Sequence, residues 1–132
     1  MNLFHGGRTL TQLDAVRLHK LVDRAPSDTL DELLAWADTV DSRAVPSDVI
    51  TMYSQFEVQE PGADRPRRLT LCYPDDAEPS AGFISVLSPV GAALLGLRVG
   101  DTARWTGPGG QRGSARVSAL LFQPEASGDY TT

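Results

Sequence analysis

The chain has few of the side chains that catalysis and metal binding most often use. Its 132 residues include one cysteine, Cys72, and two histidines, His5 and His19. A single cysteine excludes both an internal disulfide and a thiolate zinc centre, and Cys72 lies in an apolar run that favours a buried, inert thiol. No serine stands in the nucleophile-elbow sequence of a Ser-His-Asp hydrolase. We therefore expect no catalytic residue, no metal site and no cofactor.

Long apolar runs are also missing. No segment reaches the roughly 20 apolar residues that cross a membrane, and the opening residues MNLFHGGRTL lack the apolar core of a signal peptide. We expect a cytoplasmic protein with no membrane partner. Lys20 is its one lysine, and arginine supplies the remaining basic residues. The net charge of −5 disfavours direct nucleic-acid binding, because such proteins usually carry a basic stripe.

The N-terminal third has apolar residues three and four positions apart, which predicts helices. A break at 26–28 separates a first helix, 9–25, from a second, 29–44, and Pro46 ends the second because proline disfavours helix at the preceding residue. Two helices joined by so short a turn are antiparallel neighbours. The sequence therefore predicts a helical hairpin, or short coiled coil, in residues 1–46.

From residue 47 onwards apolar and polar residues alternate, as in strands. One helix, 89–96, interrupts a series of strand-like segments separated by turns rich in glycine and proline. These segments are 48–58, 67–74, 83–88, 103–107 and 114–124. Short turns between successive strands imply a mostly antiparallel sheet. The expected fold class is α+β, with the helical hairpin followed by a sheet domain in residues 47–132.

Acidic residues gather where the two predicted helices meet, at Asp28, Asp31 and Glu32. Paired carboxylates can hold a magnesium ion. The start of a helix also favours acids through its dipole, and Thr29 with Glu32 would form a capping box. A magnesium site and helix capping therefore both remain possible roles for the acidic residues of this hairpin tip, and capping requires no bound ion.

Two other groups of side chains have simple interpretations. Arg65, Arg67 and Arg68 form a small basic group in the first β-turn, either a solvated loop or a contact with an acidic partner. Trp36 lies at the edge of the second helix's apolar face, where we expect it to pack between the hairpin and the sheet. Trp105 falls in a strand and is expected in the core.

The stretch FISVLSPVGAALLGLRVGDTARWTGPGG, residues 83–110, resembles the C-terminal domain of the bacterial Gre transcript-cleavage factors. Those domains have a strand ending in Ser-Pro, a short helix with Ala-x-x-Leu-[Ile/Leu]-Gly, a Gly-Asp turn and a Pro-Gly-Gly hairpin; the helix segment of this chain reads GAALLG. The segments DVITMYSQ, TLCYP and QPEASGDY, in the same order, are similar to the subfamily of regulators of nucleoside diphosphate kinase. The resemblance covers residues 46–132, and the hairpin more loosely.

This resemblance implies an FKBP-like fold for residues 47–132 and bacterial RNA polymerase as the partner, near the mouth of its secondary channel. In Gre factors the Ser-Pro loop and the following helix contact the polymerase. The matching positions are Ser88, Pro89, Val90, Gly91, Ala92 and Leu94, with Leu94 and Leu95 expected to pack beneath. Competition with Gre-type factors for the channel would follow.

Gre factors carry two acidic residues at the tip of a long coiled coil, where they hold a metal ion in the polymerase active site. The helices predicted here are much shorter, and the reach of a helix is proportional to its residue count. We therefore expect a transcription regulator that binds polymerase without stimulating transcript cleavage and that affects nucleoside diphosphate kinase levels.

Two alternatives remain at the level of sequence. FKBP-like sheets include peptidyl-prolyl isomerases, whose proline pocket is lined by aromatic residues, whereas the aromatic residues here are dispersed along the chain. A direct protein-interaction regulator of nucleoside diphosphate kinase would need no polymerase. An isomerase assay tests the first alternative, and copurification in the absence of polymerase tests the second.

Overall fold

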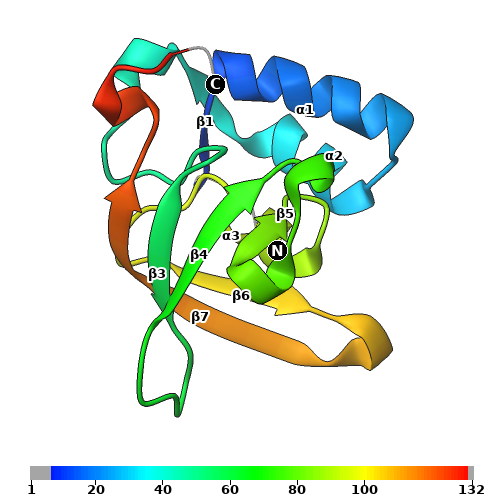
Figure 1. Ribbon diagram of the computed structural model, residues 1–132. Coiled ribbons are helices and arrows are strands. Elements are labelled where there is room, and N and C mark those ends of the chain that lie inside the picture. Colours follow the sequence, from blue (N-terminus) through cyan, green and yellow to red (C-terminus); the bar gives the residue numbers. More distant parts are fainter. Residues whose placement is uncertain (1–6, 131–132) are drawn as a thin grey trace.

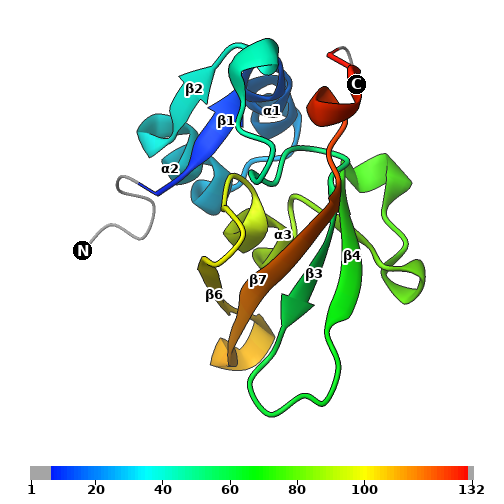
Figure 2. The same ribbon diagram turned by 90° about the vertical axis from the view of Figure 1, so that its left-hand side faces the viewer.

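The chain begins with a β–α–α–β unit. It consists of β1 (Thr9–Thr11), α1 (Gln12–Arg24), α2 (Asp28–Trp36) and β2 (Asp38–Val40). β1 and β2 pair in parallel, with Leu10 opposite Thr39, so a small two-stranded sheet joins the two ends of the helical hairpin (Figure 2). The structure, a computed structural model, describes residues 7–130.

The second helix is shorter than the sequence pattern predicts. α2 ends at Trp36, and the residues expected to continue it form β2 and a 3-10 turn, Ser42–Ala44. Asp, Thr and Val at positions 38 to 40 are poor helix formers, and the last two have β-branched side chains that suit a strand. Trp36 is 52% exposed, so the prediction that it packs between hairpin and sheet is wrong.

Each helix of the hairpin starts at a side-chain cap. The Thr11 hydroxyl accepts a hydrogen bond of 3.0 Å from the Asp14 amide, the usual N-cap contact of a threonine. α2 is capped by Ser27, whose hydroxyl accepts from the Leu30 amide at 3.2 Å. The capping box predicted at Thr29 is therefore wrong, because the N-cap is Ser27, two residues before Thr29.

A five-stranded sheet forms the second part of the fold, in the order β5-β4-β3-β7-β6. The strands are β3 (Gln55–Gln59), β4 (Arg67–Cys72), β5 (Phe83–Ser85), β6 (Thr102–Thr106) and β7 (Arg112–Phe122). β4 and β5 pair in parallel and the other neighbours are antiparallel, so the α+β class and the mostly antiparallel sheet are confirmed. The long β7 pairs with β3 and with β6, and the sheet curls along it (Figure 1).

The alternating segment 48–58 forms a strand only in its last part. Before β3 the chain makes a turn in which the Thr51 amide donates to the Ser54 hydroxyl at 2.9 Å, and the Ser54 amide donates to the Thr51 carbonyl at 3.0 Å. Tyr53 in this turn has a φ of +65°, outside the strand region. Alternation alone could not reveal the turn, because residues on both sides of it are buried.

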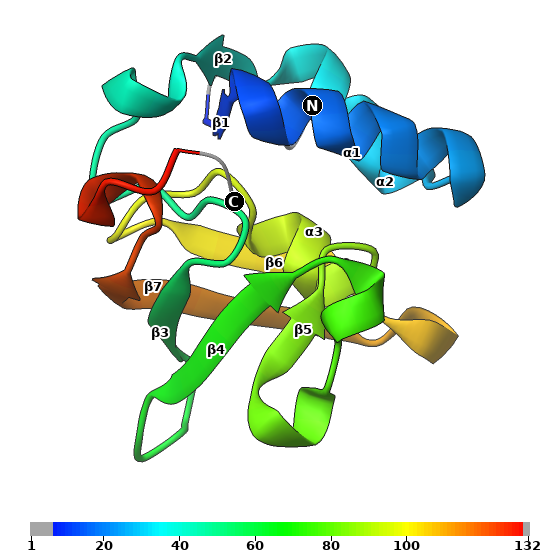
Figure 3. The same cartoon turned by 45° about the horizontal axis from the view of Figure 1, so that its top comes forward.

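One continuous apolar core joins the two parts of the fold. It includes Leu18 and Leu30 of the hairpin, Phe56 and Val117 of the sheet, and Leu94 of a short helix, α3 (Pro89–Leu94). α3 lies between the hairpin above it and the curled sheet (Figure 3). Among residues 7–130, no helix combines the length and the apolar character needed to cross a bilayer.

Candidate docking site

The Ser-Pro sequence forms a tight corner between β5 and α3. The Ser88 hydroxyl donates to the Ser85 carbonyl at 2.7 Å and accepts from the Gly91 amide at 3.0 Å. Pro89 occupies the first helical position, where its fixed φ suits the helix and its missing N–H costs nothing. The hydroxyl therefore holds the strand end and the helix start together.

Gly91 is required by a contact within the chain. A Cβ at this position would lie 2.1 Å from the Ser85 carbonyl oxygen, far inside van der Waals contact. The glycine thus lets the first turn of α3 pack directly on the end of β5. The Gre resemblance counts Gly91 among the positions that contact polymerase, whereas the structure gives it this internal packing role.

The structure divides the positions matched to the Gre Ser-Pro loop into two sets. Pro89 is exposed, and Ser88 and Val90 are half-buried; these three residues are hereafter the corner. Gly91, Ala92 and Leu94 are buried, as is Leu95 beneath them. The buried residues cannot touch a partner, because they lie on the inner side of α3, which packs against β6 and the core.

The far end of α3 is held by Arg8, which is only 7% exposed. One guanidinium nitrogen, Nη1, donates to the carbonyls of Leu95 at 2.7 Å and Ala92 at 3.2 Å. These carbonyls lie at the C-terminus of the helix, where a positive charge interacts favourably with the helix dipole. Burial lowers the pKa of Arg8 to about 10, against the effect of nearby Asp101, so the side chain stays charged at neutral pH.

Two hollows flank the corner. One of about 270 Å³ lies between Pro89 and β6, and its lining includes Arg8 and Thr29 of the N-terminal unit. A second of about 240 Å³ is lined by Pro89, Val90 and the β6–β7 turn. Trp105 lines both. The prediction that it lies in the core is only partly right, because the side chain is half-buried and packs against the core from its edge. Its ring covers Gly113, where a Cβ would come within 2.4 Å of the indole.

The acidic residues of the hairpin tip are exposed. Asp28, Asp31 and Glu32 all lie in the first half of α2 and point away from the core. The part of the chain that the structure describes contains no group of three or more His, Cys, Asp or Glu side chains able to hold a metal ion. Their position suits stabilisation of the N-terminus of α2 through its dipole.

The remaining candidate groups have ordinary surroundings. His19 is exposed on α1, and His5 lies outside the described residues. The Cys72 thiol is buried and lies 3.4 Å from the Ile84 carbonyl, and burial raises its pKa. A buried thiol with a raised pKa is a poor nucleophile.

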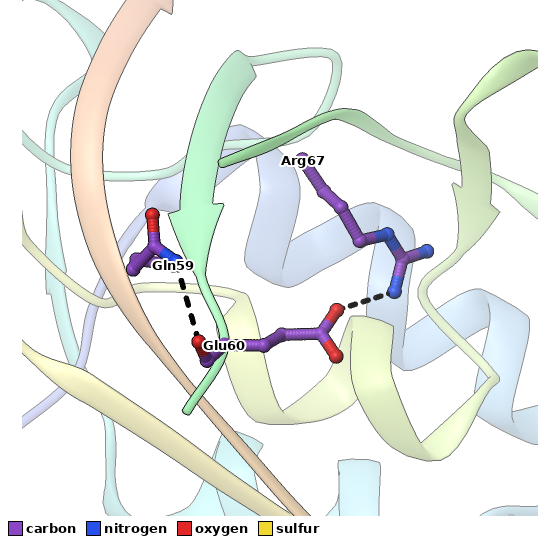
Figure 4. Close-up of polar contacts among 3 residues, drawn as sticks. All are labelled: Gln59, Glu60 and Arg67. Atoms are coloured by element: carbon purple, nitrogen blue, oxygen red, sulfur yellow. Dashed lines mark hydrogen bonds and ion pairs between the residues drawn. The ribbon is translucent and has the colours of Figure 1, made fainter. Parts of the chain in front are cut away.

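The basic group of the first β-turn is largely neutralised. Arg67 forms an ion pair of 2.6 Å with Glu60, beside the bond of 3.3 Å from the Gln59 side-chain amide to the Glu60 carbonyl (Figure 4). Arg68 lies 3.9 Å from a carboxylate oxygen of Glu57. These pairs are consistent with a solvated loop.

Sequence analysis missed a pair of buried carboxylates between the hairpin and the sheet. An Asp14 carboxylate oxygen accepts from the Met52 amide at 3.2 Å, and Glu125 accepts from the Thr51 hydroxyl at 2.7 Å. Burial is the main cause that raises the pKa of Asp14 to about 6, and the charge of Glu125 adds to it. Asp14 lies on the side of α1 that packs against the core. The sequence signal for its burial is an acidic residue at a position on the apolar face of the helix.

The fold is of the class found in the GreA/GreB family of transcription factors. A family model described as "Transcription elongation factor, GreA/GreB, C-term" matches residues 45–120, and the chain belongs to this family. The "Regulator of nucleoside diphosphate kinase" of Escherichia coli strain K12 is 39% identical, over 92% of this chain and 93% of that protein. The resemblance drawn from the sequence is thereby confirmed.

Two further similar proteins support the same family assignment. The "Transcription elongation factor GreA" of Solidesulfovibrio magneticus is 30% identical over 88% of this chain and 71% of its own length. A solved structure titled "Prokaryotic transcription elongation factor GreA/GreB from Nitrosomonas europaea" superposes with a TM-score of 0.73 at 35% identity. It covers 88% of this chain and 98% of that one, so the hairpin is shared as well as the sheet. The chain is therefore a transcription-factor-like regulator.

Proposed function

We propose that this protein binds bacterial RNA polymerase through the corner, near the mouth of the secondary channel. The observation that carries the proposal is the exposed Pro89, held rigidly from both ends of α3. Ser88 fixes the helix start to β5, and Arg8 binds its last carbonyls. A corner that is already ordered before binding loses little conformational entropy when a partner covers it. Membership of the GreA/GreB family supports polymerase as that partner.

The proposal includes the absence of transcript-cleavage activity. α1 has 13 residues and α2 has 9, which correspond to helices of about 20 Å and about 14 Å at 1.5 Å per residue. The long coiled coil implied by the Gre resemblance reaches much further. Asp28 and Asp31 at this tip would therefore stop short of the polymerase active site.

The expected consequence is that the protein regulates transcription by occupying the mouth of the polymerase secondary channel. A protein that binds at the channel mouth excludes other channel-binding factors, including Gre-type factors, and so acts in the cytoplasm, where polymerase works. The name of the Escherichia coli relative suggests that transcripts for nucleoside diphosphate kinase respond. An effect on kinase levels then needs no direct contact with the kinase.

Binding is tested with purified core polymerase and the full chain. Pro89→Glu places a charge on the corner at a helix position where an acid is tolerated, and should weaken binding at least tenfold. Pro79→Glu is the matched control, since Pro79 is also exposed and also begins a short helical turn. Equal binding of wild type and Pro89→Glu would refute docking through the corner.

Cleavage is tested on a backtracked elongation complex. The wild-type protein should leave cleavage at its spontaneous rate and should reduce cleavage by an added Gre factor. Robust stimulation by this protein alone would refute the reach argument. Binding of nucleoside diphosphate kinase without polymerase present would favour the direct interaction instead.

A further inference from the structure

Two exposed arginines stand beside the corner, one in each of the hollows that flank it. Arg104 lines the hollow between Pro89 and β6, and Arg112 lines the hollow beside Val90. Both also line a third hollow of about 670 Å³ over the β6–β7 hairpin. The hollows share Trp105, so corner, indole and arginines form one continuous surface. Arg104 and Arg112 are hereafter the arginine rim.

The register of the hairpin places the arginine rim on one side of the sheet. Arg104 pairs with Ser114 across the strands, and Thr106 pairs with Arg112. Directly opposed residues and residues two apart on a strand share a face, so both guanidinium groups extend from the same face. Trp105, between Arg104 and Thr106 on β6, faces the other side of the sheet. β6 is the last strand of its sheet, and the hollows at its open edge are lined by residues of both sides, including Trp105 with Arg104 or Arg112.

Within residues 7–130, no carboxylate pairs with this rim. Among the described residues, the side chains of Arg104 and Arg112 are exposed and make no ion pair or hydrogen bond, whereas those of Arg67 and Arg68 pair with glutamates. The described side chains that line the three hollows include arginine, threonine and serine but no aspartate or glutamate. The surface beside the corner is thus positive on a chain whose net charge is −5.

We propose that the arginine rim binds carboxylates on an acidic protein segment of the partner. The same segment places an apolar side chain against Pro89, Val90 and Trp105. Guanidinium groups match carboxylates in a two-point geometry that lysine does not offer. Charge complementarity around an apolar and aromatic centre is the usual arrangement of a protein interface, in which tryptophan and arginine carry much of the binding energy.

A nucleic acid fits this surface less well. Its backbone needs several basic contacts in a row, and the chain's overall negative charge repels a polyanion beyond the rim. The inference rests on the proposed function, because it names the chemistry of the polymerase segment that the corner meets. It adds that the segment is acidic.

The test measures binding of the full chain to core polymerase between 50 and 300 mM salt, values chosen to span strong and weak screening. Arg104→Glu/Arg112→Glu should weaken binding at least tenfold at low salt and flatten its salt dependence. The control, Arg65→Glu/Arg98→Glu, makes the same charge change at exposed arginines elsewhere and should stay within twofold of wild type. Matching melting temperatures show that both variants are folded.

The outcomes separate the two proposals. If Pro89→Glu abolishes binding and the double rim variant binds like its control, the corner docks but the acidic segment is refuted. If wild type does not bind polymerase, the proposed function fails and the inference falls with it. If wild type binds a single- or double-stranded oligonucleotide at 150 mM salt and the rim variant does not, the rim is a nucleic-acid site and the assignment to a protein segment is overturned.

Discussion

A guanidinium nitrogen of Arg8 donates a hydrogen bond of 2.7 Å to the backbone carbonyl of Leu95, 87 residues later in the chain. This bond links the start of β1 to the end of α3. It is reinforced nearby, where the Thr9 amide donates to the Gly96 carbonyl at 3.1 Å. The N-terminal unit therefore stabilises the helix that carries the corner.

Replacing Arg8 with Met should destabilise the protein. The substitution keeps the apolar stem but leaves the carbonyls of Ala92 and Leu95 without this donor inside the fold. Loss of a buried, charge-assisted contact of this kind costs about 2–4 kcal/mol. Urea denaturation measures the change in the free energy of unfolding. Arg24→Met, at an exposed position in the last turn of α1, should change it little, and equal losses in the two variants would contradict the assignment.

Replacing Gly91 with Ala should be costly although alanine favours helices. The new methyl group would lie 2.1 Å from the Ser85 carbonyl oxygen, so β5 and α3 would have to separate. Overpacking against backbone costs about 1–3 kcal/mol. Gly107→Ala is the control, because its φ of −91° is open to alanine and its nearest such contact is 3.7 Å. A thermal melt that ranks the two variants the other way would refute the close approach.

Replacing Ser88 with Ala should loosen the corner without unfolding the protein. The variant loses the hydroxyl that caps α3 at Gly91 and binds the Ser85 carbonyl. Loss of an N-cap costs about 0.5–2 kcal/mol. Faster hydrogen exchange of the amides of 88–92 would show the local effect directly. Ser80→Ala, at an exposed position, serves as the control, and unchanged exchange at the corner would contradict the capping role.

The buried Asp14 should make stability fall as pH rises above about 4. Its pKa is raised to about 6 in the fold, compared with about 3.9 in an unfolded chain. The folded state thus binds more protons between these values, and its advantage is lost as pH rises through about 6. A shift of about two units corresponds to about 3 kcal/mol at most.

Asp14→Asn tests this dependence, because it removes the ionisation and keeps an acceptor for the Met52 amide. The variant should gain stability relative to wild type between pH 4.5 and 7.5. The charged groups that act on Asp14 are Glu125, which opposes its ionisation, and Arg17, which favours it. A stability difference between wild type and variant that is independent of pH would show that Asp14 titrates normally.

The sequence alone determined the features that depend on near neighbours. The change of period near residue 47 gave the order of hairpin and sheet, and the break at 26–28 separates α1 from α2. The Ser-Pro dipeptide located the corner, because a proline can begin a helix but cannot continue one. The matches in residues 83–110 were specific enough to identify the family.

Only the tertiary structure decided the features that depend on distant contacts. α2 ends at Trp36 because the following residues pair with β1. The burial of Asp14 depends on Met52, 38 residues away. The arginine rim exists because cross-strand register puts Arg104 and Arg112 on one face beside Pro89, while the net charge suggests an acidic surface throughout. Local periodicity carries no information about such contacts, since they form only when the whole chain has folded and brought remote backbone and charge together.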